Sequence, residues 1–157
     1  MARRVLGRTA VQTLFLGRYT LVRELGSGAH ATVHLALDAA GREVAIKRIH
    51  PERARTGRAA ARLHREARAI ASIDHPGVVR GIEVGEGPDG APYLVMERLH
   101  GETLGARVAR EGRLDARAAV GLAVDLLEAL AAVHARGLVH GDVKPENVLV
   151  LESGRPV

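Results

Sequence analysis

Lysine is rare in this chain, and its two occurrences mark residues that could do chemistry. Of 23 basic side chains, only Lys47 and Lys144 are lysine. An ammonium is a compact point charge on a thin stem, whereas a guanidinium is a wide planar fork, so a narrow phosphate pocket can require lysine. Lys47 ends the string Val44–Lys47, and Lys144 lies inside the string His140–Asn147. We interpret both strings as parts of a phosphoryl-transfer site.

The string His140–Asn147 carries the strongest chemical signal. Asp142 can accept a proton from a substrate hydroxyl, as a general base does. Lys144 can neutralise charge on a transferred phosphoryl group, and Asn147 offers a neutral oxygen of the kind that Mg²⁺ accepts. The alternative is a polar loop between a helix and a strand, which the order of the other motifs disfavours.

A glycine-rich turn precedes Lys47 in the chain. It consists of Gly26-Ser27-Gly28 and lies between two expected strands. Glycine lets main-chain N–H groups approach phosphate oxygens, although a Gly-x-Gly hairpin taken alone is more often a plain turn. A dinucleotide-binding turn would be followed by a helix, whereas a strand is expected here. The turn therefore indicates a phosphate lid only together with the other motifs.

Lys47 has a candidate acidic partner. Side chains alternate along a strand, so Ala45 and Lys47 share one face, where a small residue leaves room for a planar ring and the lysine can reach phosphates. Glu66 falls on the apolar stripe of an expected helix, and an acid placed there needs a partner. We expect a Lys47–Glu66 pair. The alternatives are an ordinary edge-strand lysine and a surface glutamate paired with an arginine.

The hydrophobic pattern predicts a strand-rich half followed by a helical half. Strands are expected at 19–25, 32–37, 42–49, 78–84, 92–97 and 148–151, and helices at 58–72, 103–110 and 115–137. The long helix would begin at an Asp115 N-cap and end at Gly137. Residues 1–17 are basic and free of acids, and we expect a flexible tail there.

Composition excludes several classes of function. The net charge of +5 comes with only three aromatic residues, so the stacking platforms of nucleic-acid binding are missing. The chain has no cysteine, which excludes a disulfide framework and a thiolate metal site. No run approaches the roughly 18 apolar residues that span a membrane. We expect a cytoplasmic protein that does not bind nucleic acid and has no membrane segment in this chain.

Taken together, the motifs resemble the first part of a eukaryotic-type bacterial serine/threonine protein kinase. The likeness covers residues 19–151 and is collinear. After the glycine turn, the strand lysine and the helix glutamate come His75-Pro76-Gly77, the segment 93–99 and the loop 140–147. A shared order of this length is far more specific than any single motif.

The resemblance implies an α+β, protein-kinase-like fold. Residues 18–157 would form a partial kinase domain, with a complete five-stranded N-lobe and one helix over 18–97, a hinge at 97–101 and the start of the helical C-lobe over 102–157. It implies ATP and Mg²⁺ as cofactors and a protein with a serine or threonine acceptor as substrate.

The resemblance also implies roles for individual residues. The cover of the nucleotide would be Leu25, Gly26, Ser27, Gly28, Ala29, His30, Ala31 and Val33. The adenine contacts would be the gatekeeper Met96, the backbone of Glu97 and Leu99, and the sandwiching side chains of Val33, Ala45 and Leu149. The groups around the phosphates would be Lys47 on the α- and β-phosphates, Glu66 as its partner, Asp142 as catalytic base, Lys144 on the γ-phosphate and Asn147 on magnesium.

Three departures from the family pattern lead to further expectations. Ala31 replaces the third glycine, and Gly141 replaces the arginine that usually precedes the catalytic aspartate. His-Gly-Asp is also similar to aminoglycoside and choline-type phosphotransferases, so a fragment of a small-molecule phosphotransferase is an alternative. The sequence contains no Asp-Phe-Gly triplet. We therefore expect a truncated kinase domain that is inactive alone, with an apolar face of the helix 115–136 exposed. A non-catalytic binding module with a partner on that face is the other alternative.

Overall fold

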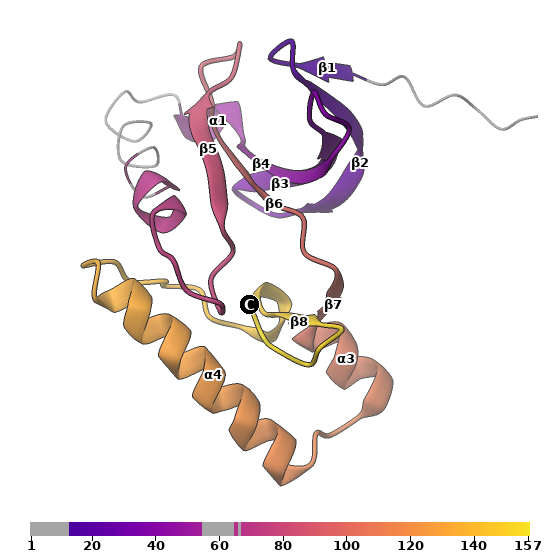
Figure 1. Cartoon of the computed structure of the whole chain (residues 1–157), viewed down its shortest axis with the longest axis vertical. Coiled ribbons are helices and arrows are strands. Elements are labelled where there is room, and N and C mark those ends of the chain that lie inside the picture. The colour runs from indigo at the N-terminus through magenta and orange to yellow at the C-terminus, as the bar shows by residue number, and fades with distance from the viewer. Residues whose placement is uncertain (1–12, 55–64, 66) are drawn as a thin grey trace, which may run out of the picture.

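A six-stranded antiparallel sheet forms the first half of the molecule (Figure 1). The computed structural model describes residues 13–54, 65 and 67–157. The strands are β1 (Thr13–Phe15), β2 (Tyr19–Ser27), β3 (Ala31–Leu37), β4 (Glu43–Ile49), β5 (Gly81–Glu86) and β6 (Pro92–Glu97). They lie in the order β1-β2-β3-β4-β6-β5, and each neighbouring pair is antiparallel. The five strands expected for this half are confirmed, with β5 starting three residues later than the hydrophobic pattern suggested.

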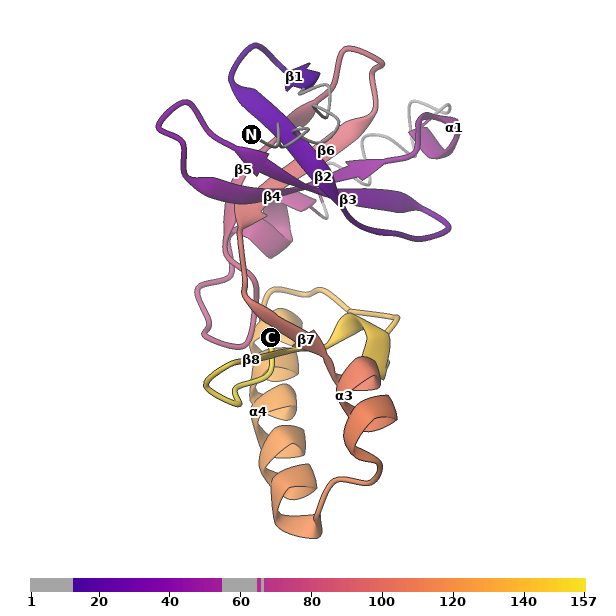
Figure 2. The same ribbon diagram turned by 90° about the vertical axis from the view of Figure 1, so that its right-hand side faces the viewer.

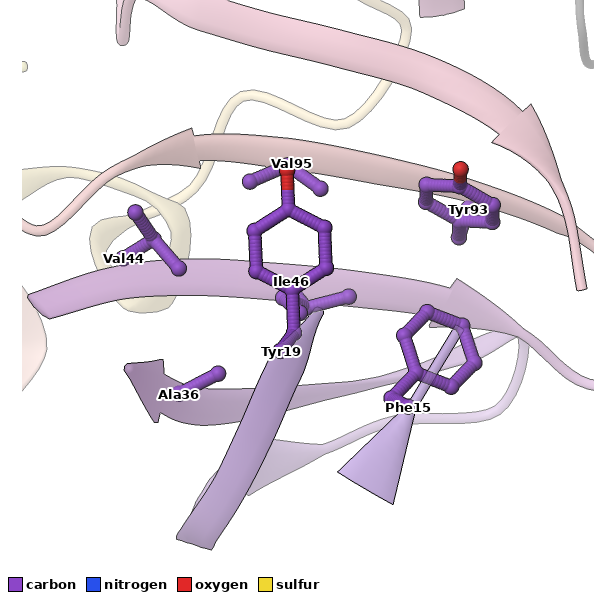
Figure 3. Close-up of a cluster of buried hydrophobic side chains, with 7 residues drawn as sticks. All are labelled: Phe15, Tyr19, Ala36, Val44, Ile46, Tyr93 and Val95. Carbon is purple, nitrogen blue, oxygen red and sulfur yellow. The ribbon is translucent and has the colours of Figure 1, made fainter. Parts of the chain in front are cut away.

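The hydrophobic core of this half lies on one face of the sheet (Figure 3). Consecutive residues of a strand point to opposite faces, so alternate residues of β4 and of β6 contribute to it. The register places Ile46 of β4 opposite Val95 of β6, and both side chains are fully buried. The cluster consists of Phe15, Tyr19, Ala36, Val44, Ile46, Tyr93 and Val95. The face with Lys47 is therefore the other one.

The start of the sheet corrects the expectation of a tail over residues 1–17. Residues 1–12 lie outside the described residues, but Thr13–Phe15 pair with β2 as strand β1. Leu16 and Gly17 both have positive φ angles, 55° and 69°, and turn the chain back into β2. Phe15 is buried, and its ring meets that of Tyr93 edge-on at 5.3 Å. The burial of one aromatic side chain stabilises a segment whose charge had suggested disorder.

The two edges of the curled sheet are joined by side chains. Edge strand β5 carries Glu83, whose carboxylate accepts hydrogen bonds from Arg18, from the Tyr19 hydroxyl at 2.9 Å and from the Tyr93 hydroxyl. Burial, followed by the hydrogen bond to Glu83, raises the pKa of Tyr19 to about 12, and the same causes raise the pKa of Tyr93. Glu83 thus holds the β1–β2 corner against β5 and β6.

The connection between β4 and β5 contains helical segments. A short helix, α1 (Pro51–Ala54), starts at a proline, which fits the first helical position because its missing N–H is not needed there. Residues 65 and 67–71 are also helical, in agreement with the end of the helix predicted over 58–72. The rest of that prediction lies outside the described residues.

The second half consists of two helices and a two-stranded ribbon (Figure 2). Its elements are β7 (Gly101–Thr103), α3 (Leu104–Glu111), α4 (Ala116–His134), the 3₁₀ turn η1 (Pro145–Asn147) and β8 (Leu149–Leu151). β7 and β8 pair antiparallel. Gly101 cannot carry a side chain there, because a Cβ atom would lie 2.3 Å from the main-chain oxygen of Val150.

Caps fix both ends of α4. The Asp115 side chain accepts a hydrogen bond from the N–H of Ala118, which confirms the predicted N-cap. Gly137 has a φ of 70°, and its N–H donates to the carbonyl of His134 while that of Leu138 donates to Val133. These two bonds form the motif in which glycine follows a helix end. The regular helix therefore stops at His134, three residues before the predicted glycine.

One face of α4 exposes apolar side chains. Leu122, Ala129 and Val133 are buried, whereas Val120 and Leu127 are 63% and 64% exposed. The sequence predicted this exposure, because the helix is apolar most of the way round. In the described parts of the chain, no helix is both long and apolar enough to cross a bilayer.

Candidate active site

The sheet gathers several predicted nucleotide-binding residues on the face opposite the core. Lys47 lies opposite Val33 on β3, and Ala45 lies opposite Met96 on β6. Residues opposite each other in an antiparallel pair share a face, and Ala45 and Lys47 share one because they are two positions apart. The four side chains therefore line one surface, with Ala45 buried and Lys47 exposed.

The predicted partner of Lys47 cannot be assessed in the same way. Glu66 lies outside the described residues, so the Lys47–Glu66 pair stays a prediction. Among the described residues no hydrogen bond or ion pair joins Lys47 to the loop that carries Asp142. The two halves of the candidate site are thus positioned by different elements.

The glycine turn joins β2 to β3 as a tight hairpin. The N–H of Gly28 donates to the carbonyl of Ala31 at 2.9 Å, which closes the turn. Nothing lies within 4 Å of where a Cβ of Gly26 or Gly28 would be, so both glycines expose main chain. Ala31, where the family pattern has a glycine, begins β3 opposite Ile49 and is buried. A methyl group is accommodated there because the residue is already part of the sheet.

The loop between α4 and β8 brings together three predicted residues. The ammonium of Lys144 lies 2.9 Å from Oδ2 of Asp142. The side-chain amide of Asn147 donates to the same Oδ2 and to the main-chain oxygen of Asp142, both at 2.8 Å. These bonds, first that from Lys144 and then that from Asn147, lower the pKa of Asp142 below its ordinary 3.8. The exposed carboxylate is therefore ionised at neutral pH.

Neighbouring residues of this loop have roles that the motif did not reveal. The imidazole of His140 accepts a hydrogen bond from the N–H of Asp142 through Nδ1, at 3.3 Å. Gly141 between them has a φ of 75°, a conformation that residues with a Cβ adopt only at a cost. The loop turns back at this glycine. The glycine in the sequence could have indicated this turn, although the family pattern indicated only that an arginine is missing there.

The ribbon β7–β8 positions the loop and ties it to the segment that follows β6. The N–H of Leu104 donates to the carbonyl of Val148 at 2.8 Å, and Leu149 lies opposite Thr103. The loop 138–147 runs across the end of the helical half that faces the six-stranded sheet (Figures 1 and 2). Glu97, where β6 ends, is anchored by its N–H to the carbonyl of Arg80 at 3.0 Å.

The loop carries one candidate ligand for magnesium, the side chain of Asn147. Because Nδ2 of Asn147 is committed to Asp142, its Oδ1 is the atom that it can offer to a cation. Mg²⁺ takes oxygen ligands and needs further carboxylates or phosphates beyond one amide. The part of the chain that the structure describes contains no group of three His, Cys, Asp or Glu side chains that could hold a metal. If the loop bound a magnesium ion, groups other than Asn147 would have to supply most of its ligands.

Comparison with known families identifies the fold. The family model for the protein kinase domain matches residues 19–156. The chain belongs to the protein kinase family. The predicted kinase-like fold is confirmed, with the correction that β1 adds a sixth strand to the expected five.

The similar proteins are bacterial serine/threonine kinases. The serine/threonine-protein kinase PksC of Streptomyces coelicolor is 41% identical over 156 residues, covering 94% of this chain and 28% of PksC. PrkC of Bacillus subtilis is 37% identical over 139 residues, covering 88% of this chain and 21% of PrkC. The chain therefore spans less than a third of the length of these two relatives.

Solved structures agree with this assignment. The PknI kinase domain of Mycobacterium tuberculosis superposes with a TM-score of 0.77 at 28% identity, covering 95% of this chain and 61% of that one. The apo form of PpkA-294 superposes with a TM-score of 0.79 and shares the fold at 24% identity, with 96% and 60% covered. The chain thus corresponds to part of a kinase domain.

Proposed function

We propose that this chain is the nucleotide-binding part of a serine/threonine protein kinase that transfers the γ-phosphoryl group of ATP to protein hydroxyls. The observation that supports it most is the arrangement of Asp142, Lys144 and Asn147, in which one ionised carboxylate is held by an ammonium and an amide. Because the proposed site uses ATP, we also propose that this part of the protein lies in the cytoplasm, where ATP is abundant.

The sheet would bind the nucleotide by its Lys47 face. The hairpin from Leu25 to Val33 would cover it, and Ala45, Met96 and Leu149 would surround the adenine. The backbone of Glu97 and Leu99 would provide its hydrogen bonds. Lys47, assisted by Glu66, would contact the α- and β-phosphates as a point charge. The opposite face is occupied by the hydrophobic core.

The loop would carry out the transfer. Asp142, oriented by its two partners, would accept the proton of the acceptor hydroxyl. Lys144 would approach the γ-phosphoryl group, and Asn147 would be one ligand of magnesium. When bound, Mg²⁺ neutralises charge on the phosphate oxygens. The described residues contain no group of three His, Cys, Asp or Glu side chains that could hold a metal by themselves, and we propose that residues 1–157 alone bind nucleotide without sustained turnover.

Nucleotide binding by the 157-residue chain tests the first part of the proposal. Isothermal titration with Mg·ATP is expected to show binding that Lys47→Met weakens at least about tenfold, since one ion contact is lost. Lys47→Arg is expected to weaken it as well, because the broad guanidinium does not replace a point charge. Arg48→Lys, one residue on and on the other face, is the matched control. Equal affinity of the wild type and Lys47→Met would contradict the proposal.

A chimera tests the second part. The kinase-domain residues of PksC that follow the matched segment are joined after Val157, and phosphoserine and phosphothreonine are counted by mass spectrometry. Activity is expected, and Asp142→Asn should reduce it by about 100- to 10,000-fold, as loss of a general base does. Phosphorylation of an aminoglycoside or choline in place of protein would favour the small-molecule alternative.

The exposed apolar face of α4 would be covered by other residues in a longer kinase domain. Val120 and Leu127 are 63% and 64% exposed, and neighbouring exposed apolar side chains often mark a surface that another element covers. We propose that further kinase-domain residues cover the helix segment 115–136. The chimera should then bind less of an apolar dye than the 157-residue chain, and equal dye binding would contradict this.

A further inference from the structure

A chain of side-chain contacts runs along the back of the glycine hairpin. The hydroxyls of Ser27 and Thr32 lie 3.0 Å apart, at the ends of β2 and β3 that flank the turn. The Thr32 hydroxyl also lies 3.0 Å from Nε2 of His50, just after β4. On the far side of the ring, Nδ1 lies 3.7 Å from a carboxylate oxygen of Glu52 in α1. Four consecutive polar groups thus link the turn to the start of a helix.

The main chain reinforces the link at its centre. The N–H of His50 donates to the carbonyl of His30, which lies inside the turn, at 3.0 Å. His50 therefore holds the hairpin at two points, one on the turn and one on β3. It follows Lys47 by only three residues, so the same strand end that carries the lysine also holds the turn.

The contacts lie on the face of the hairpin that points away from Lys47. Thr32 precedes Val33, and consecutive strand residues point to opposite faces. Because Val33 lies opposite Lys47 on the proposed nucleotide face, Thr32 faces the other way. The three side chains cannot contact the nucleotide from there, so any effect on binding acts through the position of the turn.

We propose that Ser27, Thr32 and His50 are positioning residues that hold the glycine turn at a fixed height above the phosphates. This inference rests on the proposed binding of ATP. It gives a function to Ser27, which the glycine motif leaves undetermined, and to His50, which no motif includes. Their network fixes the turn relative to the strand of Lys47, so the two phosphate-binding elements would move together.

Counting protons shows that the network is consistent whatever the charge of the ring. With Nε2 unprotonated, Ser27 donates to Thr32, which donates to His50. With both ring nitrogens protonated, His50 donates to Thr32, which donates to Ser27. Each link keeps one proton in either case. Among the described residues, the charged side chain paired with the ring is that of Glu52. Arg48, opposite Thr32 in the strand register, is paired with Asp89 at 3.0 Å.

Substitution of Thr32 in the 157-residue chain tests the proposal. Thr32→Val keeps the branched shape and removes the hydroxyl, whereas Thr32→Ser keeps the hydroxyl. Each is titrated with ATP and with adenosine, which lacks phosphates. We expect Thr32→Val to weaken ATP about three- to tenfold, the equivalent of one hydrogen bond, and to leave adenosine unchanged. Thr32→Ser should restore ATP affinity. Thr20→Val, at the far end of β2, is the control and should change neither.

The readouts separate a positioning role from a structural one. Equal weakening of ATP and adenosine, or no weakening of either, would overturn the proposal. Amide hydrogen exchange of Gly28 and His50, measured without nucleotide, is expected to accelerate in Thr32→Val and not in Thr32→Ser. If the wild type binds no nucleotide, the proposed function fails by itself. Unchanged exchange would then also show that the network does not hold the turn.

Discussion

The two halves of this molecule differ in how completely they bury their own apolar residues. In the sheet half, Ile46 and Val95 are fully buried, and Glu83 joins the two edges through three donors. In the helical half, α4 is capped at both ends, yet Val120 and Leu127 remain about two-thirds exposed, at 63% and 64%. Both halves form regular backbone hydrogen bonds, but only the sheet half contains a cluster of buried apolar side chains of this size.

The difference shows that a helix can have its caps and its backbone hydrogen bonds without burying its apolar face. Caps and hydrogen bonds form α4, but in proteins most helical stability comes from packing of an apolar face. The sheet obtains that packing from its own strands, including β1. From the residues that the structure describes, the helix α4 obtains only part of this packing. We therefore expect the sheet half to dominate the stability of the chain.

The largest expected difference in the free energy of unfolding is between two valine substitutions, one in each half. Val95→Ala opens a cavity in the sheet core, where the side chain is 0% exposed, and should lower the free energy of unfolding by about 2–3 kcal/mol. Val124→Ala on α4, where valine is 48% exposed, should change it by less than about 0.5 kcal/mol, because alanine also favours helix. Urea denaturation followed by circular dichroism measures both. Equal losses would mean that the two halves are equally packed.

Removal of the carboxylate that joins the sheet edges should have the next largest effect. Glu83→Gln leaves the hydroxyls of Tyr19 and Tyr93 with a weaker acceptor, and we expect a loss of about 1–2 kcal/mol, since hydrogen bonds to a charged group contribute more than neutral ones. Glu86→Gln, exposed on the same strand, is the control. If both variants unfold at the same urea concentration, the contacts of Glu83 do not stabilise the edge.

Alkaline pH should weaken the sheet half specifically. The folded pKa of Tyr19 is raised from 10.0 to about 12. A raised pKa contributes stability that is fully present below pH 10.0 and is lost as the pH rises through about 12. Tyr19→Phe should therefore flatten the decline in stability over this range, as measured by urea midpoints and tyrosinate absorbance. A decline of unchanged steepness would assign the loss to other groups.

The smallest expected effect is electrostatic and lies in the helical half. Lys144→Met removes the first cause of the lowered pKa of Asp142, so that pKa should rise toward its ordinary 3.8. Carbon-detected NMR titration of the side-chain carboxyl measures it. Arg136→Met, in the same half and paired with Ser72, is the control. A pKa of Asp142 that does not move would mean that Lys144 does not set it and that Asn147 and His140 do.

Much of the fold could be predicted from the sequence because the signals are local. The alternation of side chains along the chain predicted strands β2, β3, β4 and β6. Asp115 and Gly137 predicted the two ends of α4. The loop motif is also local, because Asp142, Lys144 and Asn147 lie within six residues. The bonds of Lys144 and Asn147 to Asp142 were seen only in the structure, and the roles of the three residues stay predictions. The predicted Lys47–Glu66 pair depends on a residue outside the described range and stays a prediction.

Features that depend on distant contacts could not be predicted. The strand β1 forms because Phe15 packs on Tyr93, 78 positions later in the chain, and nothing local to residues 13–17 indicates it. The contacts of Glu83 with Arg18 and Tyr19, and of His50 with Thr32, join residues whose proximity follows from sheet order and register.

The amino-acid sequence by itself determined the kinase family, the residue types of the site and the apolar surplus of the long helix. These follow from short-range spacing, which the backbone converts directly into strands, turns and helix faces. Only the tertiary structure decided that the N-terminal segment completes the sheet, that Glu83 joins the sheet edges and that a hydroxyl–imidazole network backs the glycine turn. Such contacts arise when strands curl and bring side chains together across the sheet, and that proximity has no local signature.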